Sequence, residues 1–265
     1  MKKEHSEIIV HQIAPLLARG ELSLLLGAGY SAPNDGGHGK LPGGEGLRDL
    51  ILNKVGKVPG PRTTLKDAYL VGKRALPDFD QFLSECFTVA RALPWQERMF
   101  YYAWSRIYTT NIDNVLSVAY QQAKQRGKAG GDYVFFNYSD PNVISNTIGS
   151  IPIVSIHGSS ERLADGFIFS GLEYALVTSK TLDWHRDLAA KALTGGLLVI
   201  GNQLEESDLD AYIATRELTY SGQARQIGNW IVLPNPDEIK KENYEASGYQ
   251  VIEATGEEFL SLIHI

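Results

Sequence analysis

A run of apolar residues that stops at a glycine-rich turn constrains the fold of this chain more than any other stretch. Residues 22–26 are apolar apart from Ser23, and Gly27-Ala28-Gly29-Tyr30-Ser31-Ala32 follows directly. The spacing Gly27-x-Gly29-x-x-Ala32 fits the dinucleotide-binding fingerprint, in which the first glycine allows a tight turn and the second lets backbone N–H groups approach a pyrophosphate. A glycine turn after an apolar strand is often only a turn, so the motif needs support from elsewhere in the chain.

Composition and charge narrow the class of protein. The 265 residues are 43% hydrophobic and 21% charged, which is typical of one large α/β domain or of a main domain carrying an insertion. The net charge of −6 and the lack of a Lys/Arg stripe argue against DNA or RNA as a direct partner. Cys86 is the single cysteine, so the chain has neither a disulfide framework nor a four-cysteine zinc site, and we expect no metal. We also expect a cytoplasmic protein without a membrane partner, because no run approaches the length of a membrane span and the N-terminus is charged rather than signal-like.

The first hundred residues predict helices around one strand. Ser6 can cap a first helix, and Gly20 supplies its stop. Residues 34–46 are rich in glycine and polar side chains, as in either a surface loop or a mobile lid over a ligand. Helical patterns follow at 47–51, 65–74, 79–93 and 95–104. Four helices in a row do not fit a βαβ alternation, so we expect a helical insertion packed beside a sheet.

After residue 105 the chain alternates between strands and helices. The patterns predict strands at 106–109, 133–138, 151–156, 167–169, 197–200, 230–233 and 250–252, and helices that begin at Asn111, about Thr181, Asp208 with Ser207 as cap, Asp237 and Gly256. This alternation predicts an α/β fold with a Rossmann-like, doubly wound parallel sheet, in which 133–138 is an edge strand.

We expect one domain over residues 1–265. Its Rossmann core would comprise residues 1–33 and 105–265, with the helical insertion at about 45–104. Because the chain stops soon after its last short helix, it is also compatible with the N-terminal part of a longer protein.

Three further stretches place polar groups after predicted strands, where open α/β sheets bind their ligands. They are Thr110-Asn111-Ile112-Asp113, Ile156-His157-Gly158 and Gly201-Asn202-Gln203-Leu204. Together with the glycine turn, and in this order, they resemble the signature motifs of the sirtuin family. The resemblance runs from about residue 20 to residue 260 and implies a sirtuin-like Rossmann domain that binds NAD.

Carried over position by position, the resemblance also implies roles for individual residues. Gly27, Ala28, Gly29 and Ser31 would hold the pyrophosphate, Asn111 would lie at the nicotinamide ribose, Asp113 at the carboxamide, His157 would be the general base, and Gly201, Asn202 and Asn235 would lie near the adenosine half, with Thr110 as a further NAD-binding residue. Cleavage of the nicotinamide–ribose bond expels a neutral leaving group, so it needs orientation and a base such as histidine more than a strong acid.

Each of these polar residues also has a purely structural interpretation. Asn111 could be a helix N-cap, Asp113 an acid in the first helical turn, and His157 a histidine packed at a strand end.

The chain departs from protein-deacylating sirtuins in two respects. It has one cysteine instead of the four that build their zinc lobe, and Ala32-Pro33-Asn34-Asp35-Gly36-Gly37 contains no Phe-Arg element. It is more similar to the zinc-free sirtuin-like domains of prokaryotic anti-phage defence proteins. That resemblance implies an NAD+ glycohydrolase that releases nicotinamide and ADP-ribose, with Asn111, Asp113 and His157 as catalytic residues, controlled by homo-oligomerisation or by a partner defence subunit.

Two other functions stay open on the sequence. One is a non-catalytic module that binds NAD or ADP-ribose, and the other is a zinc-free, NAD-dependent protein deacylase. Hydrolysis and cyclisation are not separated either, because both share the same ribosyl intermediate.

Overall fold

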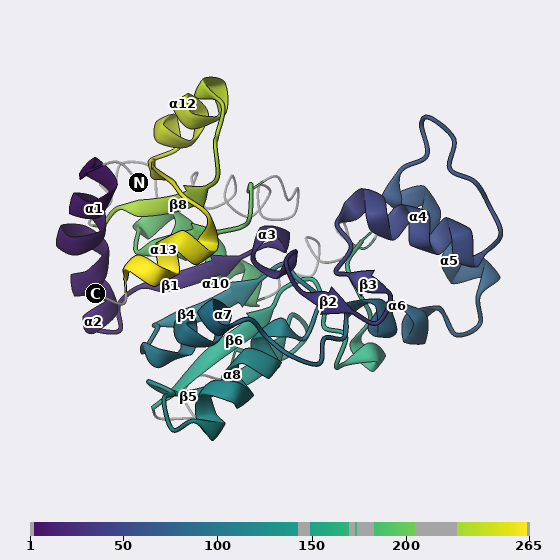
Figure 1. Ribbon diagram of the computed structural model, residues 1–265, viewed down its shortest axis with the longest axis horizontal. Helices are drawn as coiled ribbons and strands as arrows, with labels where there is room; N and C mark the ends of the chain where they lie inside the picture. The colour runs from purple at the N-terminus through teal and green to yellow at the C-terminus, as the bar shows by residue number, and fades with distance from the viewer. Residues whose placement is uncertain (1–2, 143–148, 170–172, 174–182, 205–226, 264–265) are drawn as a thin grey trace.

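Seven parallel strands form one sheet in the order β5-β6-β4-β1-β7-β8-β9 (Figure 1). The computed structural model describes residues 3–142, 149–169, 173, 183–204 and 227–263. The strands are β1 (Ser23–Leu26), β4 (Arg106–Thr109), β5 (Asp132–Asn137), β6 (Ser150–Ser155), β7 (Leu197–Ile200), β8 (Asn229–Leu233) and β9 (Tyr249–Glu253). The chain builds outward from β1 to β5 and then returns to build the other half, which confirms the doubly wound parallel sheet with β5 at its edge.

The central strand β1 is buried on both faces. All four of its residues, Ser23 to Leu26, are buried, as are all four of β7. Leu24 and Leu26 belong to the larger apolar cluster and Leu25 to the smaller one on the opposite face. Alternate side chains of a strand point to opposite faces, so a strand covered on both sides must be apolar throughout.

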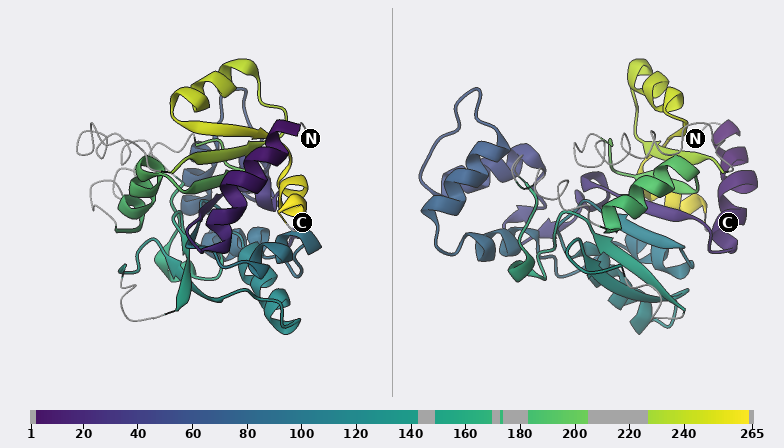
Figure 2. Two further views of the ribbon diagram at one scale, coloured as in Figure 1. Left: turned by 90° about the vertical axis from the view of Figure 1, so that its left-hand side faces the viewer. Right: turned by 180° about the vertical axis from the view of Figure 1, so that it is seen from behind.

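Helices cover both faces of this sheet. The larger cluster takes side chains from α2 (Ala14–Ala18), α7 (Pro94–Arg98), α8 (Val115–Gln125) and α13 (Gly256–Leu262), and the smaller one from α10 (Asp183–Thr194), with Tyr244 of α12 (Glu238–Ala246) packed against it. The shorter helical elements are α1 (Lys3–Ile8), a π-helical turn at Ile9–Ile13, α3 (Ala28–Ser31) within the glycine turn, and 3₁₀ turns at Met99–Tyr101 and Leu163–Asp165. The two termini lie close together, at the end of the molecule away from α4 and α5 (Figures 1 and 2).

A helical insertion lies between β1 and β4, as the sequence predicts. Its helices α4 (Gly44–Lys54), α5 (Leu65–Ala75) and α6 (Phe79–Phe87) are called the helical lobe below. Figure 1 shows α4 and α5 standing away from the sheet. A small hairpin, β2 (Asp35–Gly36) and β3 (Gly39–Lys40), leads into the lobe, and the Gly37 N–H donates to the Glu85 carbonyl of α6 at 3.1 Å.

Several predicted boundaries are wrong. Ser6 lies inside α1 and caps nothing, whereas Gly20 ends the first helical segment with φ +66°. The helix expected over 79–93 ends at Phe87, and the one over 95–104 gives way to the 3₁₀ turn after Arg98. Residues 167–169 form no strand, because the Ile168 N–H donates to the His157 carbonyl instead of to a neighbouring strand. The helix expected from Asp208 with its cap Ser207 lies outside the described residues.

The described residues contain neither a membrane-spanning helix nor a cluster of metal ligands. None of their helices is long and apolar enough to cross a membrane. They contain no group of three or more His, Cys, Asp or Glu side chains placed to hold a metal ion.

Candidate active site

Three motif segments meet where β1, β4 and β7 end. The Gly27 N–H donates to the Ile200 carbonyl at 3.1 Å, the Gly29 N–H to the Gly201 carbonyl at 2.9 Å, and the Thr110 N–H to the Leu26 carbonyl at 3.0 Å. These backbone bonds continue the sheet for a residue or two beyond the strands. They place the glycine turn between the other two segments, at the edge where α/β sheets bind ligands.

The glycines are required by close packing of one turn against another. Gly201 has φ +68°, and a Cβ there would lie 2.4 Å from the backbone nitrogen of Tyr30. A Cβ on Gly27 would lie 2.6 Å from the Cβ of Asn202. No side chain fits at either distance, so the structure explains these two motif glycines through contact between the turns.

Asn111 does not begin a helix, contrary to the prediction. Helix α8 begins at Val115 with Asn114 as its N-cap residue, so the N-cap interpretation of Asn111 is wrong. The Asn111 N–H donates to Thr109 Oγ1 at 3.0 Å, and the Val115 N–H donates to Asp113 Oδ1 at 3.0 Å. These local bonds hold residues 110–114 as a loop. The side chains of Asn111 and Asp113 therefore do not follow the spacing of a helix.

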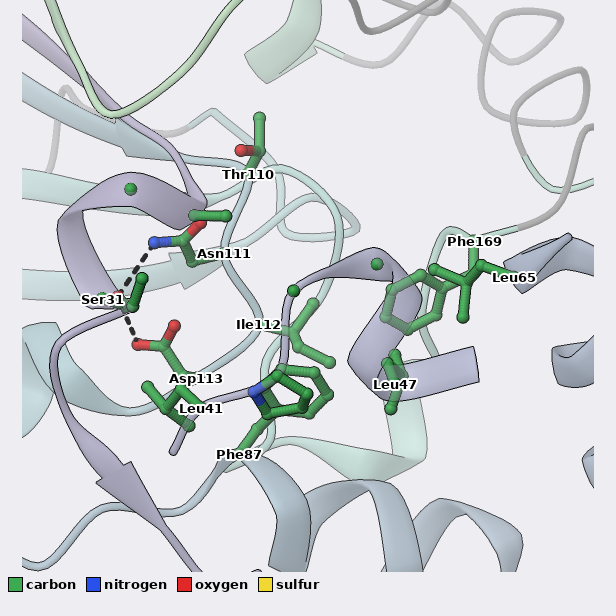
Figure 3. A pocket seen from close by; sticks show the side chains of 16 residues that line it. Ser31, Leu41, Leu47, Leu65, Phe87, Thr110, Asn111, Ile112, Asp113 and Phe169 are labelled. Atoms are coloured by element: carbon green, nitrogen blue, oxygen red, sulfur yellow. Dashed lines mark hydrogen bonds between the residues drawn. The ribbon is translucent and has the colours of Figure 1, made fainter. Parts of the chain in front are cut away.

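A chain of hydrogen bonds joins this loop to the glycine turn (Figure 3). Asn111 Nδ2 donates to Ser31 Oγ at 3.0 Å, and Ser31 Oγ donates to Asp113 Oδ1 at 3.1 Å. Asn111 Nδ2 also donates to the Gly27 carbonyl at 2.9 Å. A backbone carbonyl can only accept, so this bond fixes the orientation of the Asn111 amide and leaves its side-chain oxygen as the acceptor for a ligand.

The loop and the turn form one wall of a cavity of about 260 Å³. Its polar wall comprises Ala28, Gly29, Ser31, Thr110, Asn111 and Asp113. The opposite wall is apolar and includes Leu47, Leu65 and Phe87 of the helical lobe together with Phe169, as Figure 3 shows. A concave site with a few convergent polar groups on an otherwise apolar surface is typical of a small-molecule site.

Asp113 has an unusual ionisation in this wall. Burial raises the pKa of its carboxyl from 3.8 to about 6, although the hydrogen bonds from the Val115 N–H and the Ser31 hydroxyl favour the charged form. The carboxyl group therefore changes its charge just below neutral pH, which is a property of functional carboxylates more often than of structural ones.

His157 emerges from the neighbouring strand. Thr109 of β4 pairs with Ser155 of β6, so Asn111 and His157 each follow a paired position by two residues. The His157 side chain is buried, its carbonyl accepts from the Ile168 N–H at 3.0 Å, and His157 is not among the residues that line the cavity. The adjacent Gly158 has φ +100°, which lets the chain turn sharply at this strand end.

Asn202 and Asn235 differ in position. Asn202 is buried behind the cavity wall, where its Nδ2 donates to Thr110 Oγ1 at 3.1 Å and its Oδ1 accepts from the Leu204 N–H at 2.6 Å. Asn235 is exposed after β8, two strands away from β1, with φ +49°. The structure thus brings Asn202 to the cavity wall and leaves Asn235 at a distance along the same sheet edge.

Sequence reasoning missed several buried amides that support this wall. Asn34, Gln96 and Asn114 are buried and bonded to the segment between α6 and α7. Nothing in their spacing distinguishes them in the sequence, because each falls in a stretch interpreted as loop or helix.

Part of the chain matches a known protein family. The model of the SIR2-like domain family matches residues 105–252, which is more than half of the chain. Among solved structures, a Sir2 homologue with a histidine-to-asparagine substitution, in complex with ADP-ribose, is 12% identical, with 100% of this chain and 96% of that chain covered and a TM-score of 0.49. A complex of a Sir2 homologue with NAD is 13% identical, with coverages of 100% and 93% and a TM-score of 0.47. No curated protein matches. The chain belongs to the SIR2-like domain family.

Proposed function

We propose that this protein binds NAD+ and hydrolyses its nicotinamide–ribose bond. The observation that carries the proposal is the hydrogen-bond chain from Asn111 through Ser31 to Asp113, which unites the glycine turn with a loop of the region matched by the SIR2-like domain model in one cavity wall. A wall of this kind offers a fixed amide oxygen and a carboxylate side by side, as a site for a ribose and a carboxamide requires.

The cavity suits the nicotinamide half of the substrate. Its apolar wall accommodates a pyridinium ring, the Asp113 carboxylate accepts a hydrogen bond from the carboxamide amine, and the Asn111 side-chain oxygen accepts one from a ribose hydroxyl. The pyrophosphate lies along Gly27, Ala28, Gly29 and Ser31. The adenosine half lies toward Gly201, Asn202 and Asn235.

Hydrolysis breaks the bond between the pyridinium nitrogen and the ribose C1′. The bonding electron pair returns to the ring and gives neutral nicotinamide, and a water oxygen forms the new bond to C1′ of ADP-ribose. His157, which follows the strand next to β4, accepts the proton that this water loses. The positioned hydroxyls and carboxylate stabilise the positive charge that develops on the ribose.

In the cell, such an activity would deplete NAD+. We propose that the protein is a cytoplasmic anti-phage effector whose hydrolase activity is released by self-association or by a partner defence subunit. The hydrolase activity must be controlled in the cell, because an unregulated NAD+ hydrolase would exhaust the cofactor of its own host.

The test is nicotinamide and ADP-ribose release from NAD+, without any peptide, over a range of protein concentrations. Asn111→Ala and His157→Ala should each lower the rate by at least about 100-fold while the protein stays folded. His38→Ala is the matched control, because His38 is exposed at the β2–β3 hairpin, where it packs on Phe82.

The alternatives predict different results. Retained cleavage in both the Asn111 and the His157 variants would refute the proposed mechanism. Tight binding of NAD+ without release at any protein concentration would identify a binding module, and release that depends on an acylated peptide would identify a deacylase.

A further inference from the structure

The segment between α6 and α7, residues 88–93, directly follows Phe87 of the cavity lining and is called the strap below. It connects the helical lobe to the sheet-covering helix α7. It has no regular secondary structure, and side-chain amides satisfy much of its backbone. These amides come from both sides of the site.

One end of the strap is held by α8. Asn114 Oδ1 accepts from the Val89 N–H at 2.7 Å, and its Nδ2 donates to the Val89 carbonyl at 3.3 Å. Asn114 directly follows Asp113, so this pair of bonds fixes the strap to the loop that carries Asn111 and Asp113. Gln122, further along α8, makes the same two-way contact with Ala92, at 2.9 and 3.4 Å.

The other end of the strap is held by Gln96 of α7 and by Asn34, which lies two residues beyond the glycine turn. Gln96 Oε1 accepts from the Leu93 N–H at 2.9 Å, and Asn34 Nδ2 donates to the Arg91 carbonyl at 3.4 Å. The two side chains also bond each other, because Gln96 Nε2 donates to Asn34 Oδ1 at 2.6 Å and Asn34 Nδ2 donates to Gln96 Oε1 at 3.0 Å. Gln96 Nε2 donates in addition to the Tyr30 carbonyl, at 2.8 Å, in the residue next to Ser31.

We infer that Gln96 is a positioning residue, which sets the glycine turn against the 110–114 loop through the strap. Its side chain is fully buried and does not line the cavity. A buried amide network with every partner in place fixes one arrangement, since the loss of one member leaves the others unsatisfied. The strap is continuous with α6, so the arrangement of Ser31 against Asp113 depends on how the helical lobe sits on the sheet.

This inference rests on the proposed function, because it assigns the glycine turn to the bound nucleotide. It also predicts how the proposed hydrolase activity is regulated, namely through the helical lobe and the strap. A partner or a second copy that shifts the helical lobe would move the strap and hence the Asn111–Ser31–Asp113 chain, without touching the nucleotide.

The experiment compares substitutions of two side-chain amides that bond to the strap, Gln96 of α7, which is fully buried, and Gln122 of α8, which is half-buried. Gln96→Leu removes the link to the glycine turn, whereas Gln122→Leu removes the equivalent link to α8 and leaves the turn untouched. Leucine favours helix at both positions. The readouts are the Kd for ADP-ribose, the KM and kcat for NAD+, the unfolding midpoint in denaturant, and amide hydrogen exchange of residues 27–34.

Gln96→Leu should raise the Kd for ADP-ribose about tenfold, the effect of one or two lost hydrogen bonds, while Gln122→Leu should change it less than twofold. Both should lower the unfolding midpoint to a similar extent. Equal changes in Kd for the two variants, or an unchanged Kd in Gln96→Leu, would overturn the inference.

Two further arms keep the test decisive. If Gln96→Leu does not fold, Asn34→Ala, which removes both bonds from Asn34 to the Gln96 amide and the bond to the strap at Arg91, must raise the Kd at least threefold or the inference fails. If the wild-type protein binds no ADP-ribose, the proposed function fails, and the inference is then decided by hydrogen exchange. Residues 27–34 must exchange faster in Gln96→Leu than in Gln122→Leu, and equal exchange would overturn it.

Discussion

At the scale of single residues, the buried Asp113 carboxyl lowers the stability of the fold at neutral pH. Its folded-state pKa of about 6 lies above the ordinary value of 3.8. The folded protein therefore holds a proton that the unfolded chain has lost between these two pH values, and stability falls as the pH rises through 6. Asp113→Asn should raise the free energy of unfolding by about 2 kcal/mol at pH 7.5 and leave it nearly unchanged below pH 4, as measured by denaturant titration.

Asp67 supplies the control, with the opposite sign. The Thr64 hydroxyl and N–H hold the pKa of Asp67 below its ordinary value in the capping box of α5. Its contribution is present at neutral pH and is lost as the pH falls through the folded-state pKa, so Asp67→Asn should destabilise the protein at pH 7.5. A stability gain at neutral pH in both variants would show that the effect is one of net charge and not of Asp113.

At the scale of elements, the close contact between the glycine turn after β1 and the turn at Gly201 after β7 limits which residues fit there. Gly201→Ala adds a Cβ at 2.4 Å from the Tyr30 nitrogen and must displace either β7 or the glycine turn. Gly56→Ala is the matched control, because Gly56 has a similar φ of +70° and nothing within 4 Å of the added atom. The Gly56 substitution therefore costs only the strain of a left-handed backbone conformation in a residue that has a Cβ.

We expect Gly56→Ala to cost about 1 kcal/mol and Gly201→Ala at least about 3 kcal/mol in the free energy of unfolding. The Gly201 variant should also lose NAD+ binding, because the Gly29–Gly201 backbone bond cannot form. Equal costs for the two substitutions would mean that the turns separate without penalty.

The sheet elements could be predicted from the sequence because their signal is local. Four consecutive buried apolar residues followed by Gly201 define β7, and its predicted bounds agree with the structure. The strap could not be predicted, since residues 88–93 continue the apolar pattern of α6 and only distant amides compete for their backbone. Likewise the Phe167–Phe169 stretch has strand-like residues, but Gly166 at φ +74° turns the chain away from the sheet.

The candidate site likewise has parts that the sequence predicts and parts that it does not. The position of the glycine turn and of residues 110–113 at one edge of the sheet could be predicted, because both directly follow strands; that residues 111–114 form a loop and not a helix could not. The bond between Ser31 and Asp113 joins residues that are 82 positions apart, and no periodic pattern specifies it. The apolar wall could not be predicted either, because Leu47, Leu65, Phe87 and Phe169 come from four separate segments of the chain.

At the scale of the whole molecule, one carboxylate ties the helical lobe to the segment that follows His157. Glu173 Oε1 accepts from the Tyr69 hydroxyl at 3.2 Å and pairs with Lys73 Nζ at 3.3 Å, and both of these residues lie on α5. Glu173 Oε2 accepts from the Phe169 N–H at 2.9 Å, and the Phe169 ring packs on Tyr69 in the cavity wall. This contact closes the side of the cavity opposite Asn111.

Glu173→Ala should therefore loosen α5 without loosening the sheet. We expect amide exchange in Leu65–Ala75 to accelerate by roughly tenfold, as for the loss of one to two hydrogen bonds, while exchange in β1 and β4 stays unchanged. The KM for NAD+ should rise, because Phe169 loses its anchor in the cavity wall. Glu85→Ala is the control, since the Glu85 carboxylate accepts from Gln81 within α6 itself. Accelerated exchange in the sheet as well would show that the lobe and the sheet unfold as one unit, and a shift of the lobe could then not regulate the site.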